Sequence, residues 1–187
     1  PRRMKVITVI GNRPQFVKAA AVSRRLREAH EEILVHTGQH YDDELSTVFV
    51  QELGIPKPER ELGIGGGSNT EQTARMLAEL GPMMAAERPD VLLVYGDTNS
   101  TLAGALVAAK LGVAVAHVEA GLRSFDRTMP EELNRVLVDQ MSAALFCPTA
   151  GAVANLAAEG ITQGVQVVGD VMLDANLTLA PLARERS

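Results

Sequence analysis

The chain has 187 residues, of which 46% are hydrophobic and 22% charged, a composition typical of one globular domain with a full core. It carries 18 Lys and Arg residues against 23 Asp and Glu residues, a formal net charge of -5, and only 3% of its residues are aromatic. The acidic balance and the scarcity of stacking side chains argue against a nucleic-acid-binding protein.

The cysteine content and the apolar runs indicate a cytoplasmic location. The single cysteine, Cys147, rules out an intrachain disulfide, which fits a reducing compartment. The longest apolar runs fall far short of the roughly 20 residues that a membrane span requires, so we expect no membrane association. The stretch of residues 4–10 contains Lys5 and Thr8 and lacks a small-residue cleavage site, which favours a first strand over a signal peptide.

Short β-branched runs alternate with segments of helical periodicity, a pattern that predicts a parallel sheet with crossover helices. In chain order, the expected strands are residues 4–10, 32–37, 60–62, 91–95, 114–118, 145–147 and 165–168. The expected helices are one opening at Pro14, then residues 42–53, one capped by Ser68 or Asn69 that reaches residue 87, 99–111, 130–143 and 150–159.

This order predicts an α/β fold with a doubly wound, mainly parallel, Rossmann-like sheet. No internal repeat or linker interrupts it, so we expect one domain over residues 1–169. Residues 170–187 read as a helical tail that leads toward a further, absent domain. On the first helix, apolar spacing predicts an inner face made of Phe16, Ala19, Val22, Leu26 and Ala29.

Polar side chains gather directly after the expected strands. The clusters are residues 11–15, 38–41, 96–100 and 119–123. In open α/β sheets ligands bind at the carboxyl ends of the strands, so these clusters predict a polar site at one edge. The loops of the opposite edge carry mainly turn-forming residues and solvated charges.

Arg13 and Lys18 lie at the start of the first helix, where backbone N–H groups and the helix dipole favour an anion such as phosphate. The structural alternatives are an ion pair for Arg13 and a solvated helix charge for Lys18. Residues 11–13 do not form a dinucleotide-binding or P-loop motif, so neither NAD nor ATP is indicated. Residues 65–67, three glycines, indicate a mobile loop.

Asp97 and Glu119 each follow an apolar strand. Asp97 either has a functional role or forms an N-cap or Asx turn for the helix that begins at Asn99, and the residues themselves leave both readings open. Glu119 has no capping role to explain it, and a buried carboxylate costs several kcal/mol unless it is paired, which favours a functional role. Glu131 and Glu132 follow Pro130 in a first helical turn, where acids are stabilised by the dipole without any function.

The histidines do not indicate a metal site. His36 and His40 are four residues apart across a strand end, and no third ligand has suitable spacing. His117 lies within an apolar strand, which favours a hydrogen-bonded core histidine over a base. We therefore expect no metal and no cofactor.

Read together, the polar segments closely resemble those of the non-hydrolysing UDP-N-acetylglucosamine 2-epimerases. The matching segments are Gly11-Asn12-Arg13-Pro14-Gln15 with Lys18, Thr37-Gly38-Gln39-His40, Tyr95-Gly96-Asp97-Thr98, His117-Val118-Glu119-Ala120-Gly121-Leu122-Arg123 and Pro130-Glu131-Glu132-Leu133-Asn134-Arg135. The resemblance spans nearly the whole chain, and its one departure is Asn12, where many members carry Thr.

The resemblance implies the N-terminal half of a GT-B fold that interconverts UDP-N-acetylglucosamine and UDP-N-acetylmannosamine by elimination and re-addition of UDP. By motif match, Asp97, Glu119 and Glu131 form the acid/base set, and Arg13 and Lys18 bind the nucleotide sugar together with Asp97 and Glu119. It also implies a homodimer and a second domain with further UDP contacts. We thus expect a fragment or a truncated gene product that is inactive alone.

Two other readings remain open. A GT-B glycosyltransferase would use the same fold and a nucleotide sugar, but it would need an acceptor. A non-catalytic nucleotide-sugar-binding or assembly module would need neither. The family resemblance also extends to enzymes acting on UDP-linked diacetamido uronic acids, so the sugar itself stays undetermined at this point.

Overall fold

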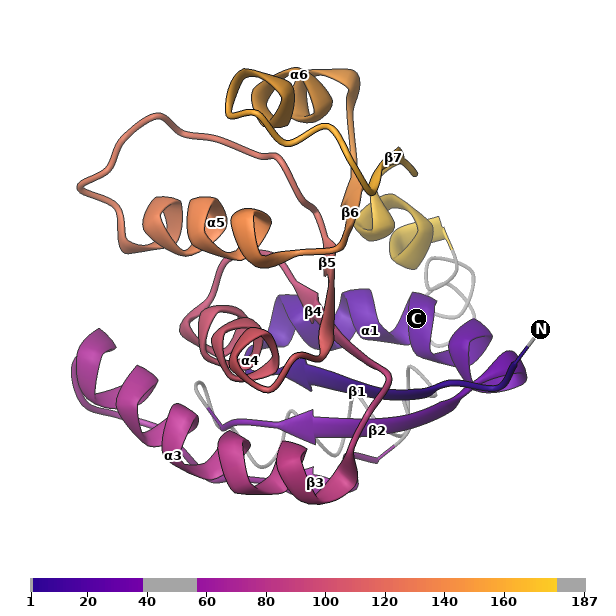
Figure 1. Ribbon diagram of the computed structural model, residues 1–187, viewed down its shortest axis with the longest axis vertical. Coiled ribbons are helices and arrows are strands. Elements are labelled where there is room, and N and C mark those ends of the chain that lie inside the picture. The colour runs from indigo at the N-terminus through magenta and orange to yellow at the C-terminus, as the bar shows by residue number, and fades with distance from the viewer. Residues whose placement is uncertain (1, 39–56, 178–187) are drawn as a thin grey trace, which may run out of the picture.

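The computed structural model describes residues 2–38 and 57–177 and contains one seven-stranded parallel sheet (Figure 1). The strand order is β3-β2-β1-β4-β5-β6-β7. The strands are β1 (Lys5–Ile10), β2 (Glu31–His36), β3 (Arg60–Glu61), β4 (Val91–Tyr95), β5 (Ala114–Val118), β6 (Ala144–Cys147) and β7 (Val165–Val167). The predicted α/β class with a wound parallel sheet is confirmed.

The helices connect successive strands as crossovers. They are α1 (Arg13–Ala29), α3 (Asn69–Glu87), α4 (Asn99–Lys110), α5 (Pro130–Met141) and α6 (Ala150–Ala158). Residues 171–177 are also helical, whereas the helix predicted over residues 42–53 lies outside the described residues. None of the described helices combines the length and the apolar character needed to cross a membrane.

Helices cover both faces of the sheet (Figure 1), and an apolar cluster fills the space between the helices and the sheet on each face. On one face, Phe16 of α1 packs in a cluster with Leu34 and Tyr95. On the other face, Met76 of α3 packs with Val9 of β1, and helices α4 and α5 lie on the same side. A third cluster, built from α6 and β6, extends this layer toward the edge strand β7.

The inner face of α1 is largely the predicted one: Phe16 and Ala19 are buried, and Val22 and Leu26 pack against the same cluster. Ala29 is exposed, contrary to the prediction, and Gln15 and Ser23 complete the buried face. The buried Gln15 is satisfied because its side-chain amide donates to the Tyr95 carbonyl at 2.7 Å and its oxygen accepts from the Gly11 N–H at 2.7 Å. Apolar periodicity alone misses such a residue, since its partners come from elsewhere in the chain.

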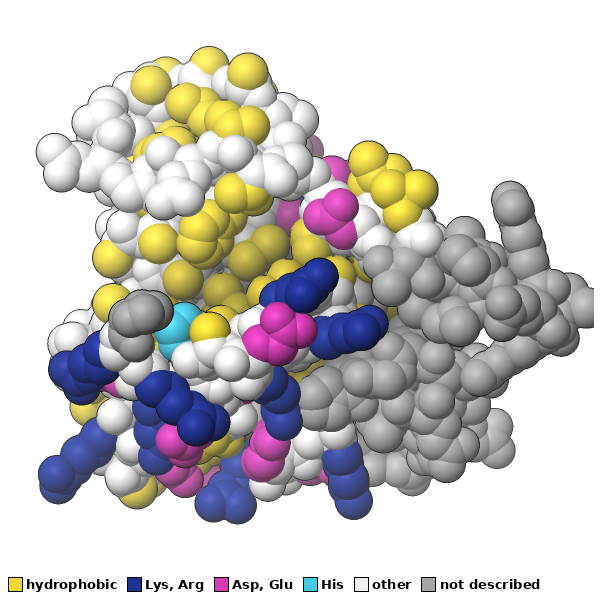
Figure 2. All heavy atoms as spheres, turned by 90° about the vertical axis from the view of Figure 1, so that its right-hand side faces the viewer, with side chains coloured by type: hydrophobic (Ala, Val, Ile, Leu, Met, Phe, Trp, Pro, Cys, Tyr) yellow, Lys and Arg dark blue, Asp and Glu magenta, His cyan; other side chains and the backbone are white. Residues whose placement is uncertain are grey.

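The strands β1 and β4 are hydrogen-bonded neighbours, and successive strands are added on opposite sides of them: β2 and β3 on the β1 side, and β5, β6 and β7 on the β4 side. Such a reversal of strand order leaves a crevice at the carboxyl ends of the two strands, the usual ligand position in open α/β sheets. At the opposite edge, where the strands begin, Figure 2 shows Lys and Arg side chains interspersed with Asp and Glu side chains. Several are paired, as in Lys5 with Glu87 at 2.7 Å and Arg2 with Asp90 at 3.1 Å.

Candidate functional site

The turn from β1 into α1 supplies the first side chains of the site. Asn12 caps α1, because its side-chain oxygen accepts the N–H of Gln15 at 3.1 Å. Arg13 is the first residue of α1 and is exposed, whereas the Lys18 side chain, one turn later, is only 11% exposed. The expected anion-binding position at this helix start therefore carries one accessible and one enclosed cation.

The turn after β4 carries Asp97. The structure assigns the cap of α4 to Thr98, whose hydroxyl accepts the N–H of Thr101 at 3.3 Å, so the reading of Asp97 as the helix cap is wrong. The Asp97 carboxylate instead lies 2.7 Å from the Arg135 guanidinium. Asn134 donates to the Asp97 backbone carbonyl at 2.8 Å. Both partners come from α5, which fixes the position of Asp97.

The turn after β5 presents Glu119 to the same place. Glu119 has a left-handed backbone with a φ of 68°, a conformation that non-glycine residues rarely adopt. Its carboxylate forms an ion pair with the Lys18 ammonium. A Cβ built on Gly96 would lie 3.4 Å from Glu119 Oε2 and 3.6 Å from Lys18 Nζ, so the turn that leads to Asp97 borders this pair. The three predicted turns thus meet at one edge of the sheet.

The adjacent acids Glu131 and Glu132 at the start of α5 have different environments. Glu132 is buried and accepts the backbone N–H groups of Ser124 and Phe125, each at 2.9 Å. Burial alone would raise the pKa of Glu132, but these hydrogen bonds and the contact with Arg135 outweigh burial and lower it to about 2. Glu131 is exposed, and its carboxylate makes no hydrogen bond or ion pair within the described ranges. Glu132 is structural, whereas Glu131 is accessible to a ligand.

A buried network of polar side chains is hydrogen-bonded to the backbone of the turns after β4 and β5. His117 is 1% exposed and is hydrogen-bonded through both ring nitrogens, so the prediction of a hydrogen-bonded core histidine is confirmed. One partner is Asp139, which also accepts from Arg123 at 2.8 Å. Arg123 in turn pairs with Glu159 at 2.7 Å. Burial disfavours the Arg123 cation, but the bonds to Glu159 and Asp139 prevail and raise its pKa.

The motif match included Arg135 but gave it no role, and the sequence indicated no role for Asp139. The local sequence gives one indication for Asp139: it falls on the buried face of a helix, where an unpaired carboxylate would destabilise the fold, so a partner is expected. The pairing of Arg135 with Asp97 spans 38 positions and leaves no local pattern.

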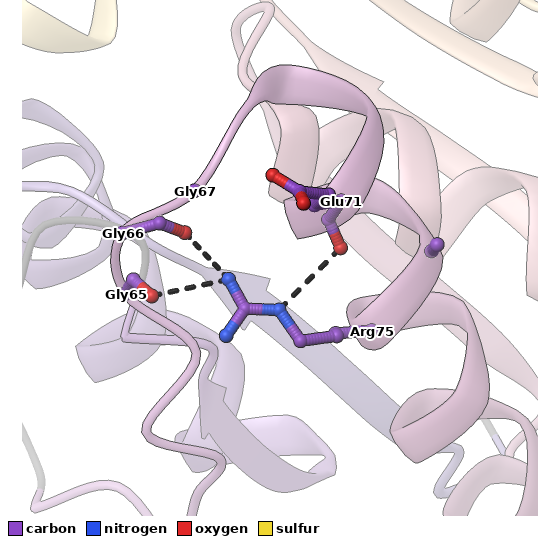
Figure 3. Close-up of a pocket in the computed structure, with 6 residues that line it drawn as sticks. Gly65, Gly66, Gly67, Glu71 and Arg75 are labelled. Atoms are coloured by element: carbon purple, nitrogen blue, oxygen red, sulfur yellow. Dashed lines mark hydrogen bonds between the residues drawn. The ribbon is translucent and has the colours of Figure 1, made fainter.

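The glycine loop after β3 forms a shallow hollow of about 560 Å³ (Figure 3). Arg75 of α3 points into the loop and donates to the carbonyls of Gly65 and Gly66. The hollow lies close to the carboxyl end of β2, because Gly65 is near the Gly38 carbonyl. It is therefore a neighbour of the carboxyl edge of the sheet.

No group of His, Cys, Asp and Glu side chains suited to a metal ion occurs in residues 2–38 and 57–177. His36 is buried, and burial lowers its pKa to about 4. His40 lies outside the described residues.

The fold and the site define a Rossmann-like domain in which carboxylates and cations come together where the strand order changes direction. A family model described as UDP-N-acetylglucosamine 2-epimerase matches residues 24–187. The chain belongs to the UDP-N-acetylglucosamine 2-epimerase family, and the resemblance found in the motifs is confirmed.

Individual relatives agree with this assignment. The chain is 53% identical over 184 residues to a UDP-N-acetylglucosamine 2-epimerase homolog of Methanococcus maripaludis, covering 98% of this chain and 52% of the relative. It is 53% identical over 185 residues to the UDP-2,3-diacetamido-2,3-dideoxy-D-glucuronate 2-epimerase of Pseudomonas aeruginosa, covering 96% and 52%.

A solved structure, the Methanocaldococcus jannaschii UDP-GlcNAc 2-epimerase in complex with UDP-GlcNAc and UDP, superposes with a TM-score of 0.94 at 47% identity. The match covers 97% of this chain and 51% of that one. The chain thus spans about half the length of the relatives it matches.

Proposed function

We propose that this chain supplies one lobe of the active site of a UDP-N-acetylglucosamine 2-epimerase. The observation that carries the proposal is the meeting of the Lys18–Glu119 ion pair with the Asp97 turn at the sheet reversal. A substrate that combines a diphosphate with a sugar requires cations and proton-transferring groups side by side, and this edge offers both.

The proposed reaction removes the sugar C2 proton and breaks the C1–O bond to UDP. The electrons of the C2–H bond form a C1–C2 double bond, and UDP leaves with the electrons of the C1–O bond. UDP then adds back to C1 while a proton is delivered to the opposite face of C2. One group must accept a proton and another must donate one, a task for carboxylates in different environments.

We assign the acid/base roles to Asp97, Glu119 and Glu131. Two of them are held by cations, Glu119 by Lys18 and Asp97 by Arg135, and ionised carboxylates can accept a proton. Glu131 is exposed in the first turn of α5, the helix whose Arg135 pairs with Asp97. We assign nucleotide-sugar binding to Arg13 and Lys18, since developing charge on a departing diphosphate needs preorganised cations.

The complete active site requires a second lobe, and the assembly is proposed to be a cytoplasmic homodimer. An apolar groove of about 280 Å³ between α3 and α4 supports self-association through this domain. Its lining includes Leu77, Leu106 and Leu111. Sedimentation equilibrium of the complete gene product tests this point, and a monomer at micromolar concentration would contradict it.

Hydrogen exchange at the sugar tests the chemistry. The complete gene product is incubated in deuterated water with UDP-N-acetylglucosamine alone, and in a second arm with the UDP-linked diacetamido glucuronate. We expect deuterium at C2 and formation of the manno epimer from UDP-N-acetylglucosamine, with no acceptor present. A requirement for an acceptor would indicate a glycosyltransferase instead.

Isosteric variants test the assigned residues. Asp97→Asn and Glu119→Gln are expected to lower the exchange rate by at least about a hundredfold, within the range typical of general acid–base groups. Glu87→Gln is the matched control, since Glu87 lies at the opposite edge of the sheet and pairs with Lys5. Exchange at the wild-type rate in Asp97→Asn and Glu119→Gln would refute the assignment.

A further inference from the structure

His117 is surrounded by two hydrogen-bond acceptors. Its Nδ1 lies 2.7 Å from Asp139 Oδ1, and its Nε2 lies 2.7 Å from the carbonyl oxygen of Gly96. A neutral imidazole carries only one N–H group. With a neutral ring, one of the two short contacts would set a nitrogen lone pair against an oxygen lone pair, unless Asp139 held the proton.

Asp139 is an unsuitable place for that proton. Its other oxygen, Oδ2, accepts from the Gly121 N–H at 3.0 Å and from the Arg123 guanidinium at 2.8 Å. Both are donors to a buried carboxylate, and one is a permanent cation, so they stabilise the ionised form of Asp139 independently of the charge on His117. Asp139 is therefore ionised near neutral pH, and the imidazole is left to supply both hydrogens.

We propose that His117 is a buried imidazolium and that, in this form, it positions the two turns that carry Asp97 and Glu119. The positioning role rests on the proposed epimerase function, whereas the charge state does not. His117 itself touches no predicted ligand position and is a positioning residue rather than a catalytic one.

The charges around His117 balance, which makes a buried imidazolium acceptable. Asp139 on α5 is its direct partner, and Arg123 in the loop after β5 shares that carboxylate. Glu159 at the end of α6 pairs with Arg123, so two cations meet two anions. The Cys147 thiol of β6 also lies close enough to feel the Asp139 charge, and burial, followed by that charge, raises its pKa and keeps it neutral. A buried charge is tolerated where it is paired and hydrogen-bonded in this way.

The imidazolium and its carboxylate act on backbone groups of the site. The Nε2–H group binds the Gly96 carbonyl, which directly precedes Asp97, and Asp139 binds the Gly121 N–H, two residues after Glu119. Gly96, Glu119 and Gly121 all have positive φ angles, of 62°, 68° and 81°. Glycine adopts such angles freely, whereas Glu119 keeps its angle only where surrounding contacts hold the backbone. The contacts to the Gly96 carbonyl and the Gly121 N–H, on either side of the site, converge on His117 and Asp139.

Nuclear magnetic resonance of the histidine rings tests the charge state in this chain. Long-range ¹H–¹⁵N correlations, with His117 assigned through its backbone, report whether each ring nitrogen carries hydrogen. At neutral pH we expect both His117 nitrogens to show the shifts of protonated nitrogen. The internal control is His36, whose lowered pKa of about 4 predicts one protonated and one unprotonated nitrogen. An unprotonated nitrogen at His117 would overturn the proposal.

Steady-state kinetics of the complete gene product tests the positioning role. His117→Gln keeps an N–H donor for the Gly96 carbonyl, whereas His117→Phe keeps a ring and removes both donors. We expect His117→Phe to lower kcat by about a hundredfold and His117→Gln by about tenfold, with KM changed less than about threefold, because the loss lies in the transition state.

The possible outcomes separate the two proposals. If both variants fold and turn over like the wild type, the positioning role is wrong while the epimerase assignment stands. If the wild-type protein shows no C2 exchange, the proposed function fails, and the ring-nitrogen measurement still decides the charge state of His117.

Discussion

Glu131 and Glu132 are neighbours in sequence, and their environments predict opposite results for the same substitution. Glu132→Gln keeps the size of the side chain but removes its charge. The Glu132 side chain is only 3% exposed and accepts from Ser124, Phe125 and Arg135. The amide group of glutamine places its NH₂ donor against one of these donors, so at least one hydrogen bond that holds the loop before α5 is lost.

The magnitude follows from the pKa of the carboxyl group. The pKa of Glu132 falls from 4.5 to about 2 because its hydrogen bonds outweigh the effect of burial. At about 1.4 kcal/mol for each pH unit by which a pKa moves, the ionised carboxylate stabilises the folded state by about 3 kcal/mol near pH 7. Because glutamine keeps one carbonyl acceptor, we expect Glu132→Gln to lower the free energy of unfolding by about 2 kcal/mol.

Urea unfolding at a series of pH values measures this effect. The pKa of Glu132 is lower in the folded state, so its stabilisation is fully present above about pH 5 and is lost as the pH falls toward 2. The wild-type protein should therefore lose stability in this range faster than Glu132→Gln. The difference between the two proteins should shrink steadily on acidification.

Glu131→Gln is the matched control, because the Glu131 carboxylate is exposed and makes no bond within the described ranges. We expect its free energy of unfolding to stay within about 0.5 kcal/mol of the wild type. Equal destabilisation by the two substitutions would refute the reasoning. So would a gap between wild type and Glu132→Gln that remains constant from neutral pH to about pH 3, since the gap would then not depend on ionisation.

Three further predictions concern stability, ionisation and reactivity. Gly121→Ala would place a Cβ 2.4 Å from the Ala152 carbonyl oxygen at a φ of 81°, whereas Gly160→Ala, at a φ of 82°, would place one where nothing lies within 4 Å. Gly121→Ala should therefore lower the thermal unfolding temperature more than Gly160→Ala does. Equal decreases would contradict the close approach at Gly121. The ring of His36 should remain neutral down to about pH 5 in an NMR titration, because burial lowers its pKa to about 4, and titration near pH 6.5 would contradict this. Cys147 is fully buried with a raised pKa, so thiol reagents should label it only on unfolding, and rapid labelling of the native protein would oppose this placement.

The strands and most helices followed from local sequence because local physics determines them. Residues 91–95 and 114–118 form strands with the expected bounds, since each is a short apolar run enclosed by turn-forming residues. Ser68 caps α3 through a reciprocal pair with Glu71, a spacing that can be read directly from the sequence. The resemblance to the epimerase family then implied that these elements form the N-terminal half of a GT-B fold.

The site was predictable only in part, because its decisive contacts are long-range. The meeting of the start of α1, which carries Lys18, with the turns that carry Asp97 and Glu119 follows from strand order, since parallel strands end at the same edge. The partner of Asp97 could not be predicted, because Arg135 lies 38 positions away on a helix whose rotation is set by packing. Periodicity likewise misses Gln15, whose burial is explained by the Tyr95 carbonyl 80 positions away.

The backbone of Glu119 carries a wider consequence. A glycine at this position would adopt the φ of 68° without the crowding that any Cβ brings there. Local stability alone thus favours a residue with no side chain, and the chain nevertheless retains one with a carboxylate. The carboxylate pairs with Lys18, and the acid–base role that we propose for it gives a reason to keep a side chain at a position where glycine would be less strained.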